Sequence, residues 1–204
     1  MDQHLSQLAQ GIHLTGDIRT DMESFLVHHS CVRTVGHSME VAAKARQLAA
    51  RFGEDEQLAE ISGWLHDSSA VIPNDQRISL AKQWGLKVLA EEETVPMIIH
   101  QKLSVIIARD IFGVKSEAVL NAIGCHTTLK ANATVFDKIV FIADKISWDQ
   151  EVTPPYLAGV LLALEKSLDR AVFHYLDYLW QRRRALLVIH PWLAEAHQQL
   201  SCLV

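Results

Sequence analysis

Apolar residues recur at intervals of three and four along most of the chain, and stretches that alternate between apolar and polar residues are nearly absent. The first pattern is typical of helices with one buried face, whereas half-buried strands require the second. The sequence therefore predicts an all-α protein. Glycine, proline and capping residues between the periodic segments place helices at roughly 4–13, 17–28, 31–52, 57–66, 75–84, 100–112, 116–126, 134–147, 155–182 and 190–202.

The length of the chain, 204 residues, suits one globular domain with its own hydrophobic core and is short for two. No internal repeat and no linker rich in glycine or serine divides it. We expect a single domain over residues 1–204, with the core motifs at about 20–150 and C-terminal helices over 155–202.

Charge and cysteine content exclude several classes of protein. The net charge of -5 argues against nucleic acid as a partner. Cys31, Cys125 and Cys202 are widely spaced, which argues against a disulfide framework and a thiolate zinc site. The first residues lack a signal-peptide pattern, and no apolar run reaches the roughly 20 residues that span a bilayer. We expect a cytoplasmic protein without membrane contact.

Histidines and aspartates stand on helix faces that the apolar pattern marks as buried. In the predicted helix 31–52, steps of four back from Val41 reach His37 and then Arg33. Four later helices carry such residues on the same kind of face, namely His66 with Asp67, His100, His126 and Asp144. A hydrogen-bonded core histidine or a helix cap explains any single case. The whole set is costly to bury unless its charges are compensated.

A divalent cation removes this conflict because it stabilises ionised carboxylates and neutral imidazoles together. Nitrogen and oxygen ligands without thiolate suit iron, manganese, cobalt or zinc. Asp67, at a helix end, has two oxygens and can bridge two ions, and such a pair about 3.5–4 Å apart can clamp a phosphate during in-line attack. The predicted metal ligands are His37, His66, Asp67, His100, His126 and Asp144.

This ordered series resembles the pattern H…HD…H…H…D of the HD superfamily of metal-dependent phosphohydrolases. Within that superfamily the chain resembles the YqeK family of symmetrical diadenosine tetraphosphate hydrolases, over roughly residues 20–200. The matching segments are Arg33–His37, Val41–Phe52, Ile61–Asp67, Ile99–His100, Lys102–Leu103, Cys125–Thr128, Asp137–Asp144 and Val188–Pro191.

The resemblance implies the all-α HD fold, a di-iron centre on the six ligands, and a homodimer. It also implies that diadenosine tetraphosphate is split symmetrically into two ADP molecules. The expected partner is thus a nucleotide substrate or product with an adenine or guanine base. We expect the ions to lower the pKa of a shared water, and the resulting hydroxide, oriented by Asp67, to attack phosphorus.

Groups that stabilise the developing negative charge are expected close to the ligands in sequence. Arg33 lies on the predicted buried line, where an unpaired guanidinium is costly, so we interpret it, with Asp67, as catalytic and also as substrate-binding. The other predicted substrate contacts are Lys102, Thr127, Thr128, Lys130 and Lys145. For Lys102, Thr127, Thr128 and Lys130, a surface cation or a capping hydroxyl is at least an equally good interpretation.

Two segments depart from the family pattern, and both bear on substrate choice. Ser68–Val71 lacks the lysine that many relatives carry after His-Asp, and Lys145–Asp149 replaces an aromatic residue followed by Glu-Pro. Two alternative functions therefore stay open. One is a nucleotidase or nucleoside triphosphate hydrolase with a single ion, and the other is a nucleotide sensor without turnover. The single ion would be held by His37, His66, Asp67 and Asp144.

Overall fold

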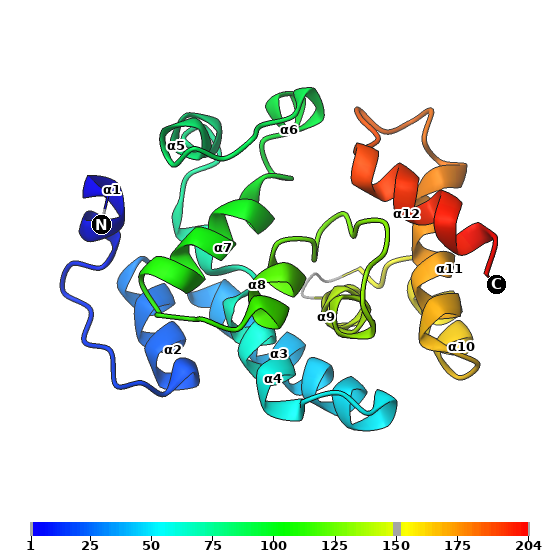
Figure 1. Ribbon diagram of the computed structural model, residues 1–204, viewed down its shortest axis with the longest axis horizontal. Coiled ribbons are helices and arrows are strands. Elements are labelled where there is room, and N and C mark those ends of the chain that lie inside the picture. The colour runs from blue at the N-terminus through cyan, green and yellow to red at the C-terminus, as the bar shows by residue number, and fades with distance from the viewer. Residues whose placement is uncertain (1, 149–151, 204) are drawn as a thin grey trace.

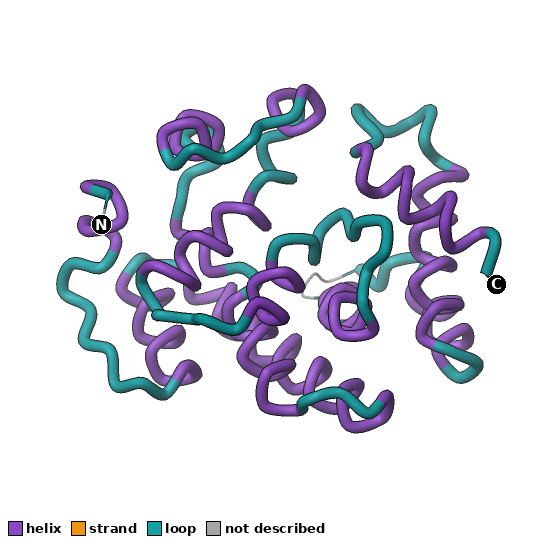
Figure 2. Tube along the Cα trace, in the orientation of Figure 1, coloured by secondary structure: helices purple, strands orange, loops and turns teal. Residues whose placement is uncertain are grey.

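The computed structural model describes residues 2–148 and 152–203, so Asp149, the end of the second atypical segment, lies outside the described residues. Within these ranges all regular secondary structure is helical, which confirms the predicted class (Figure 2). The elements are α1 (Gln3–Leu8), α2 (Ile18–His28), α3 (Val32–Phe52), α4 (Glu56–Leu65), the 3-10 helix η1 (Ser68–Val71), α5 (Arg77–Gln83), α6 (Ala90–Thr94), α7 (His100–Asp110), α8 (Glu117–Ile123), α9 (Val135–Ile146), α10 (Leu157–Leu164), α11 (Leu168–Gln181) and α12 (Pro191–Ser201).

The prediction of one helix over 155–182 is wrong, because the chain forms α10 and α11 instead. Ser167 between them has an extended backbone, and its side chain accepts a hydrogen bond from the N–H of Arg170. An N-cap of this kind starts a new helix. The continuous apolar periodicity of the segment concealed the break.

The short helix α6 was not predicted, and α1 is shorter than the predicted 4–13. The α6 sequence has three consecutive glutamates, Glu91 to Glu93, so it has no apolar periodicity to detect. Its middle glutamate, Glu92, is nevertheless buried. A polar helix can pack inside a protein when its charge finds partners, and single-sequence patterns do not report such partners.

Capping side chains set the start of several helices that carry the site. Asp55 and Thr134 accept hydrogen bonds from backbone N–H groups in the first turns of α4 and α9. Gly53 ends α3 in the left-handed conformation, with φ of 75°. Because α4 starts at a fixed cap and runs for ten residues, His66 becomes its C-cap.

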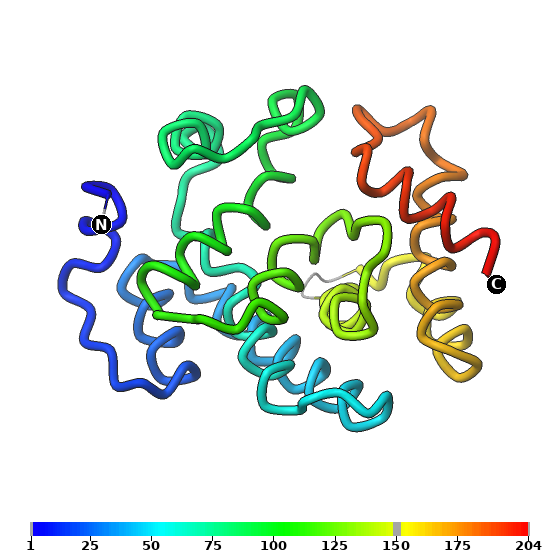
Figure 3. The backbone as a smooth tube through the Cα atoms, in the orientation of Figure 1, coloured from blue at the N-terminus to red at the C-terminus, as the bar shows by residue number. Residues whose placement is uncertain are grey.

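Helix α3 is the central element and packs along both α4 and α9 (Figure 1). Its neighbouring residues Val41 and Ala42 point into two different hydrophobic cores. The first core joins α3 and α9 to α10, α11 and α12. The second joins α4 to α1, α2, α5, η1, α7 and α8. The two termini lie at opposite ends of the long axis (Figure 3).

The crossing of α3 and α4 is unusually close at one glycine. A Cβ atom on Gly63 would lie 2.4 Å from the Cα of Ala42. No residue larger than glycine fits there without moving a backbone, and the contact lies one turn before His66. Every helix in the described part of the chain is too short or too polar to cross a lipid bilayer.

Candidate metal centre

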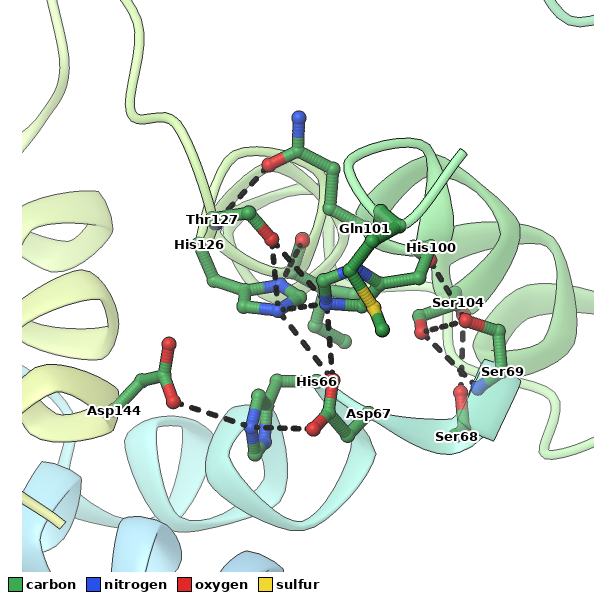
Figure 4. A network of polar contacts seen from close by, with 12 residues as sticks. His66, Asp67, Ser68, Ser69, His100, Gln101, Ser104, His126, Thr127 and Asp144 are labelled. Carbon is green, nitrogen blue, oxygen red and sulfur yellow. Dashed lines mark hydrogen bonds and ion pairs between the residues drawn. The ribbon is translucent and has the colours of Figure 1, made fainter. Parts of the chain in front are cut away.

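Six side chains from separate positions along the chain converge on one place, and Figure 4 labels five of them. They come from α3, the end of α4, the residue that follows it, the start of α7, the loop after α8, and α9. These are the six predicted ligands: His37, His66, Asp67, His100, His126 and Asp144. The fold therefore brings together the six side chains that the sequence predicted to share a site.

The first group contains His37, His66, Asp144 and one oxygen of Asp67. The Nε2 of His37 lies 3.2 Å from Oδ1 of Asp144 and 3.2 Å from Nε2 of His66. The Oδ2 of Asp67 lies 3.5 Å from Nε2 of His66 and 3.9 Å from Nε2 of His37. Four side chains thus direct nitrogen and oxygen atoms at one point.

The second group contains His100, His126 and the other oxygen of Asp67. The Oδ1 of Asp67 lies 3.1 Å from Nε2 of His100 and 3.6 Å from Nε2 of His126. The two Nε2 atoms are 2.8 Å apart. Asp67 therefore belongs to both groups, with a different oxygen in each.

The tautomers of the histidines test whether a cation fits between these atoms. The Nδ1–H of His66 donates to the carbonyl of Gly63 at 2.7 Å, and that of His126 donates to the carbonyl of Ile123 at 2.8 Å. His100 has the same arrangement, with its Nδ1 2.5 Å from the carbonyl oxygen of Met97. Nδ1 therefore carries the proton in each ring, and Nε2 presents a lone pair.

Lone pairs that face each other at hydrogen-bond distance repel unless a positive charge lies between them. This applies to the Nε2 atoms of His100 and His126, because both rings have their protons on Nδ1. A divalent cation is the natural partner of neutral imidazoles fixed in this way by backbone carbonyls. The residues present fit a metal ion in each group.

The pKa values of the buried histidines favour the same state. Burial lowers the pKa of His126 to about 4 and also lowers the pKa of His66. Both rings are therefore neutral at pH 7. Neutral imidazole is the form that binds metal.

The two aspartates are ionised despite their surroundings. Burial alone raises the pKa of Asp67, but its interactions with His66, His100 and His126 outweigh burial, so the pKa lies well below its usual value. Burial also acts to raise the pKa of Asp144, but the positive charge of Lys145 outweighs burial, so this pKa too lies below its usual value. The Nζ of Lys145 lies 2.5 Å from Oδ2 of Asp144, while Oδ1 faces His37. Ionised carboxylates complete a typical set of metal ligands.

Gln101, which the sequence analysis did not identify, holds the second group together. It is fully buried in α7, and its side-chain oxygen accepts hydrogen bonds from the backbone N–H groups of Thr127 at 3.0 Å and Thr128 at 3.3 Å. Gln101 thus joins the helix that carries His100 to the loop that carries His126 (Figure 4).

A serine network lies on the other side of α7. The hydroxyl of Ser69 donates to the carbonyl of His100 at 2.8 Å, and the hydroxyl of Ser104 donates to Ser69 at 2.9 Å. Ser68 and Ser69 are buried directly after Asp67. The segment after Asp67 therefore has a structural use here, since Ser69 attaches it to α7. Ser104 lies on the apolar face of the predicted helix 100–112, and a polar residue on such a face indicates a buried hydrogen bond.

The structure corrects the predicted burial of Arg33, whose side chain is exposed. Arg33 lies in the first turn of α3, and there it borders a cavity of about 580 Å³ together with Trp148, Tyr156 and Tyr178. A helix face is buried only where another element covers it, and periodicity does not reveal that. Arg33 is therefore not a buried guanidinium that needs an anionic partner, and the role of Arg33 stays a prediction.

The two threonines predicted to contact substrate, Thr127 and Thr128, have different surroundings. The hydroxyl of Thr127 lies 3.2 Å from the Nε2 atoms of both His100 and His126, so it faces the second group. Thr128 is buried, and its hydroxyl donates to the carbonyl of Leu129 at 2.9 Å. Thr127 is therefore the threonine that stands next to the ligands.

The three predicted lysines all have partners within the protein. Lys102 contacts the buried Glu92 at 2.8 Å, and Lys130 contacts Asp137 at 3.3 Å. Lys145 contacts the predicted ligand Asp144. Of the three, Lys145 is thus the one that the structure brings into contact with the six predicted ligands.

Comparison with known families agrees with this geometry. The family model described as HD domain matches residues 34–149, more than half of the chain. The chain belongs to the HD domain family. The matched range contains all six candidate ligands of the HD domain.

Relatives of this HD domain protein include an uncharacterized protein in the pepC 5' region of Lactococcus lactis subsp. cremoris, 46% identical over 143 residues that cover 70% of this chain and 72% of the relative. A Staphylococcus aureus protein named symmetrical bis(5'-nucleosyl)-tetraphosphatase is 25% identical over 169 residues, which cover 82% and 83%. A Bacillus subtilis protein of the same name is 28% identical over 121 residues, which cover 59% and 62%.

A solved structure has the same fold. It is the crystal structure of a predicted HD superfamily hydrolase involved in NAD metabolism from Clostridium acetobutylicum. The TM-score is 0.82 at 24% sequence identity, and the match covers 95% of this chain and 100% of that chain. The all-α HD fold is thereby confirmed.

Proposed function

We propose that this HD domain protein is a metal-dependent hydrolase that splits diadenosine tetraphosphate symmetrically into two ADP molecules. The observation that carries the proposal is the position of Asp67, whose two oxygens face two separate histidine groups. The names of the Staphylococcus aureus and Bacillus subtilis relatives support the choice of substrate.

The chain would hold one divalent ion with His37, His66, Asp67 and Asp144, and a second with Asp67, His100 and His126. Such a pair supplies Lewis acidity at the phosphoryl oxygens and activates water as the nucleophile. We propose iron for both positions. The ligand set, which has nitrogen and oxygen but no thiolate, also suits manganese, cobalt or zinc.

The surrounding residues have positioning and electrostatic roles in this proposal. Lys145 neutralises the outer oxygen of Asp144, so the site retains capacity for an anionic substrate. Thr127 presents a hydroxyl at the edge of the second group. We assign Arg33 to substrate binding rather than to a buried catalytic role, because it borders the exposed cavity with Trp148. Aromatic and guanidinium planes of this kind stack on nucleobases.

We also propose the wider properties that the sequence and the family resemblance together lead us to expect. They are a homodimer in the cytoplasm, a single domain over residues 1–204, and an adenine or guanine nucleotide as the partner rather than nucleic acid. Sedimentation of the purified chain tests the dimer.

The deciding experiment is turnover by protein whose metal content is known. Chain stripped with a chelator is reconstituted anaerobically with ferrous iron, and in parallel with manganese, and then incubated with diadenosine tetraphosphate. The expected result is about two ions per chain and ADP as the nucleotide product. ATP together with AMP would contradict symmetric cleavage.

Two controls separate the alternatives. One ion per chain, with hydrolysis of simple nucleoside triphosphates, would support the single-ion nucleotidase. Nucleotide binding without product at any metal loading would support the sensor. His126→Ala is expected to lose turnover, whereas His174→Ala, which changes an exposed histidine on α11, is expected to retain it.

A further inference from the structure

Arg77 in α5 is a buried cation with neutral neighbours. Only 7% of its surface is exposed. Its Nε donates to the carbonyl of Ile72 at 3.2 Å, and its Nη1 contacts the sulfur of Met97 at 2.9 Å. Among the described residues, no carboxylate lies within ion-pair distance of the guanidinium, although the exposed Arg46 and Arg109 each have one.

A buried cation without a counter-charge is unfavourable, and a thioether is a weak acceptor. Burial lowers the pKa of Arg77, and the negative charge of Asp67 opposes that change. Asp67, the shared ligand, is therefore the acid whose charge reaches the guanidinium. The arrangement has a positive charge next to the metal centre but no anion on the protein that pairs with it.

The contacts of Arg77 attach it to two segments that adjoin residues of the second group in sequence. Ile72 is the C-cap of η1, which follows Asp67 directly. Met97, on the other side, accepts the Nδ1–H of His100 through its carbonyl. The guanidinium is thus bonded to both chain segments that carry Asp67 and His100.

Part of the guanidinium is free to bind a ligand. Its Nη2 makes no hydrogen bond with the described residues, yet it is not among the fully enclosed polar atoms that lack a partner. Nη2 therefore reaches accessible space. The fork of N–H donors on arginine matches the oxygens of a phosphate group.

We propose that Arg77 binds a phosphate group of the ligand beside the second group of metal ligands. The identity of that ligand as a nucleotide polyphosphate rests on the proposed function. Arg77 supplies the cation that Ser68–Val71, directly after Asp67, does not contain. It reaches the same region from α5, ten residues further along the chain.

Inorganic phosphate is the probe that tests this inference, because its binding does not depend on turnover. Calorimetric titration compares wild type, Arg77→Met, Arg77→Lys and the control Arg46→Met, each loaded with metal and checked for metal content and thermal stability. Arg77→Met is expected to bind phosphate about tenfold more weakly or worse, as loss of a charged hydrogen bond predicts. Its metal content should be unchanged. Arg77→Lys should keep part of the affinity, and Arg46→Met all of it.

A folded Arg77→Met protein with full metal content and wild-type phosphate affinity would overturn the proposal. If that variant does not fold, Arg77→Lys decides, since phosphate affinity equal to wild type would exclude a role for the guanidinium fork. The failure of the proposed function looks different. In that case wild type binds phosphate through Arg77 but releases no ADP from diadenosine tetraphosphate.

Discussion

The side-chain oxygen of Gln101 accepts a hydrogen bond from the backbone N–H of Thr127 at 3.0 Å. This contact connects the two segments that supply His100 and His126. The first group is carried by α3, α9 and the end of α4, which pack directly on one another, and α7 likewise packs on α8. The second group has one carboxylate where the first has two, and a buried amide connects the segments of its two histidines.

Gln101→Met, which keeps the shape of the side chain but removes its hydrogen bonds, is expected to weaken binding of the second ion. Loss of such a supporting contact typically reduces metal affinity by about 10–100-fold. Titration of the metal-free protein with cobalt, followed by visible absorption, should show an unchanged first step and a weakened second one.

Gln101→Glu is the matched control, because a carboxylate still accepts the N–H of Thr127. It should lose less affinity than Gln101→Met. Equal weakening of both binding steps in Gln101→Met would mean that Gln101 supports the fold as a whole and not the second group in particular.

Asp67→Ala is expected to remove both ions and all turnover, since each group loses one of the two oxygens of this shared carboxylate. His126→Ala should remove one ion only. Metal content per chain, measured after gel filtration, distinguishes the two variants. Two retained ions in Asp67→Ala would show that the carboxylate does not bridge.

The parts of the site that lie on regular helices were predictable, and those that depend on tertiary contacts were not. His37 and Asp144 were found because each extends an apolar stripe in steps of three or four. Gln101 and Arg77 gave no such signal. The contacts that single them out are with Thr127 for Gln101 and with Met97 for Arg77, and both partners are distant in sequence.

The sequence pattern predicts the solvent exposure of a side chain less well than its direction. Arg33 and His37 lie on the same line of α3, yet only His37 is covered by α4 and α9. Conversely, Glu92 lies in a run of three acids that indicates a surface, and it is fully buried. Periodicity gives the direction of a side chain, whereas the neighbouring elements decide what it meets.

Gly63→Ala is expected to destabilise the protein by about 1–3 kcal/mol or more, because the new methyl group would meet the backbone of Ala42. The displaced turn also carries the carbonyl that fixes His66, so metal affinity should fall as well. Urea denaturation of the metal-free variant measures the first effect, and metal titration the second.

Gly36→Ala is a suitable control for the loss of stability, because a Cβ at this helical position has no atom within 4 Å. Alanine is preferred to glycine inside a helix, so this variant should gain up to about 1 kcal/mol. A Gly63→Ala protein as stable as wild type would mean that α3 and α4 can separate at little cost.

Glu92 ties α6 to α7 and to the start of α12. Its Oε1 lies 2.8 Å from the Nζ of Lys102 and 3.6 Å from the Nε2 of the buried His190. Burial alone raises the pKa of Glu92, but its contacts with His190 and Lys102 outweigh burial, so the pKa lies below its usual value. The ionised carboxylate therefore stabilises the fold.

Glu92→Gln is expected to lower the free energy of unfolding by about 2–4 kcal/mol at pH 7, because it leaves the two bases without their buried partner. A depressed pKa contributes stability above the pKa of the unfolded chain, about 4.3, and this contribution is lost as the pH falls through the folded value. The difference in unfolding free energy between wild type and Glu92→Gln should therefore become smaller as the pH falls. Urea titrations of metal-free protein at pH 7 and near pH 4 measure it.

Glu93→Gln, which breaks only an exposed contact with Lys82, should cost less than about 1 kcal/mol. If the difference in unfolding free energy between wild type and Glu92→Gln grew at acidic pH, this role of the Glu92 carboxylate would be ruled out.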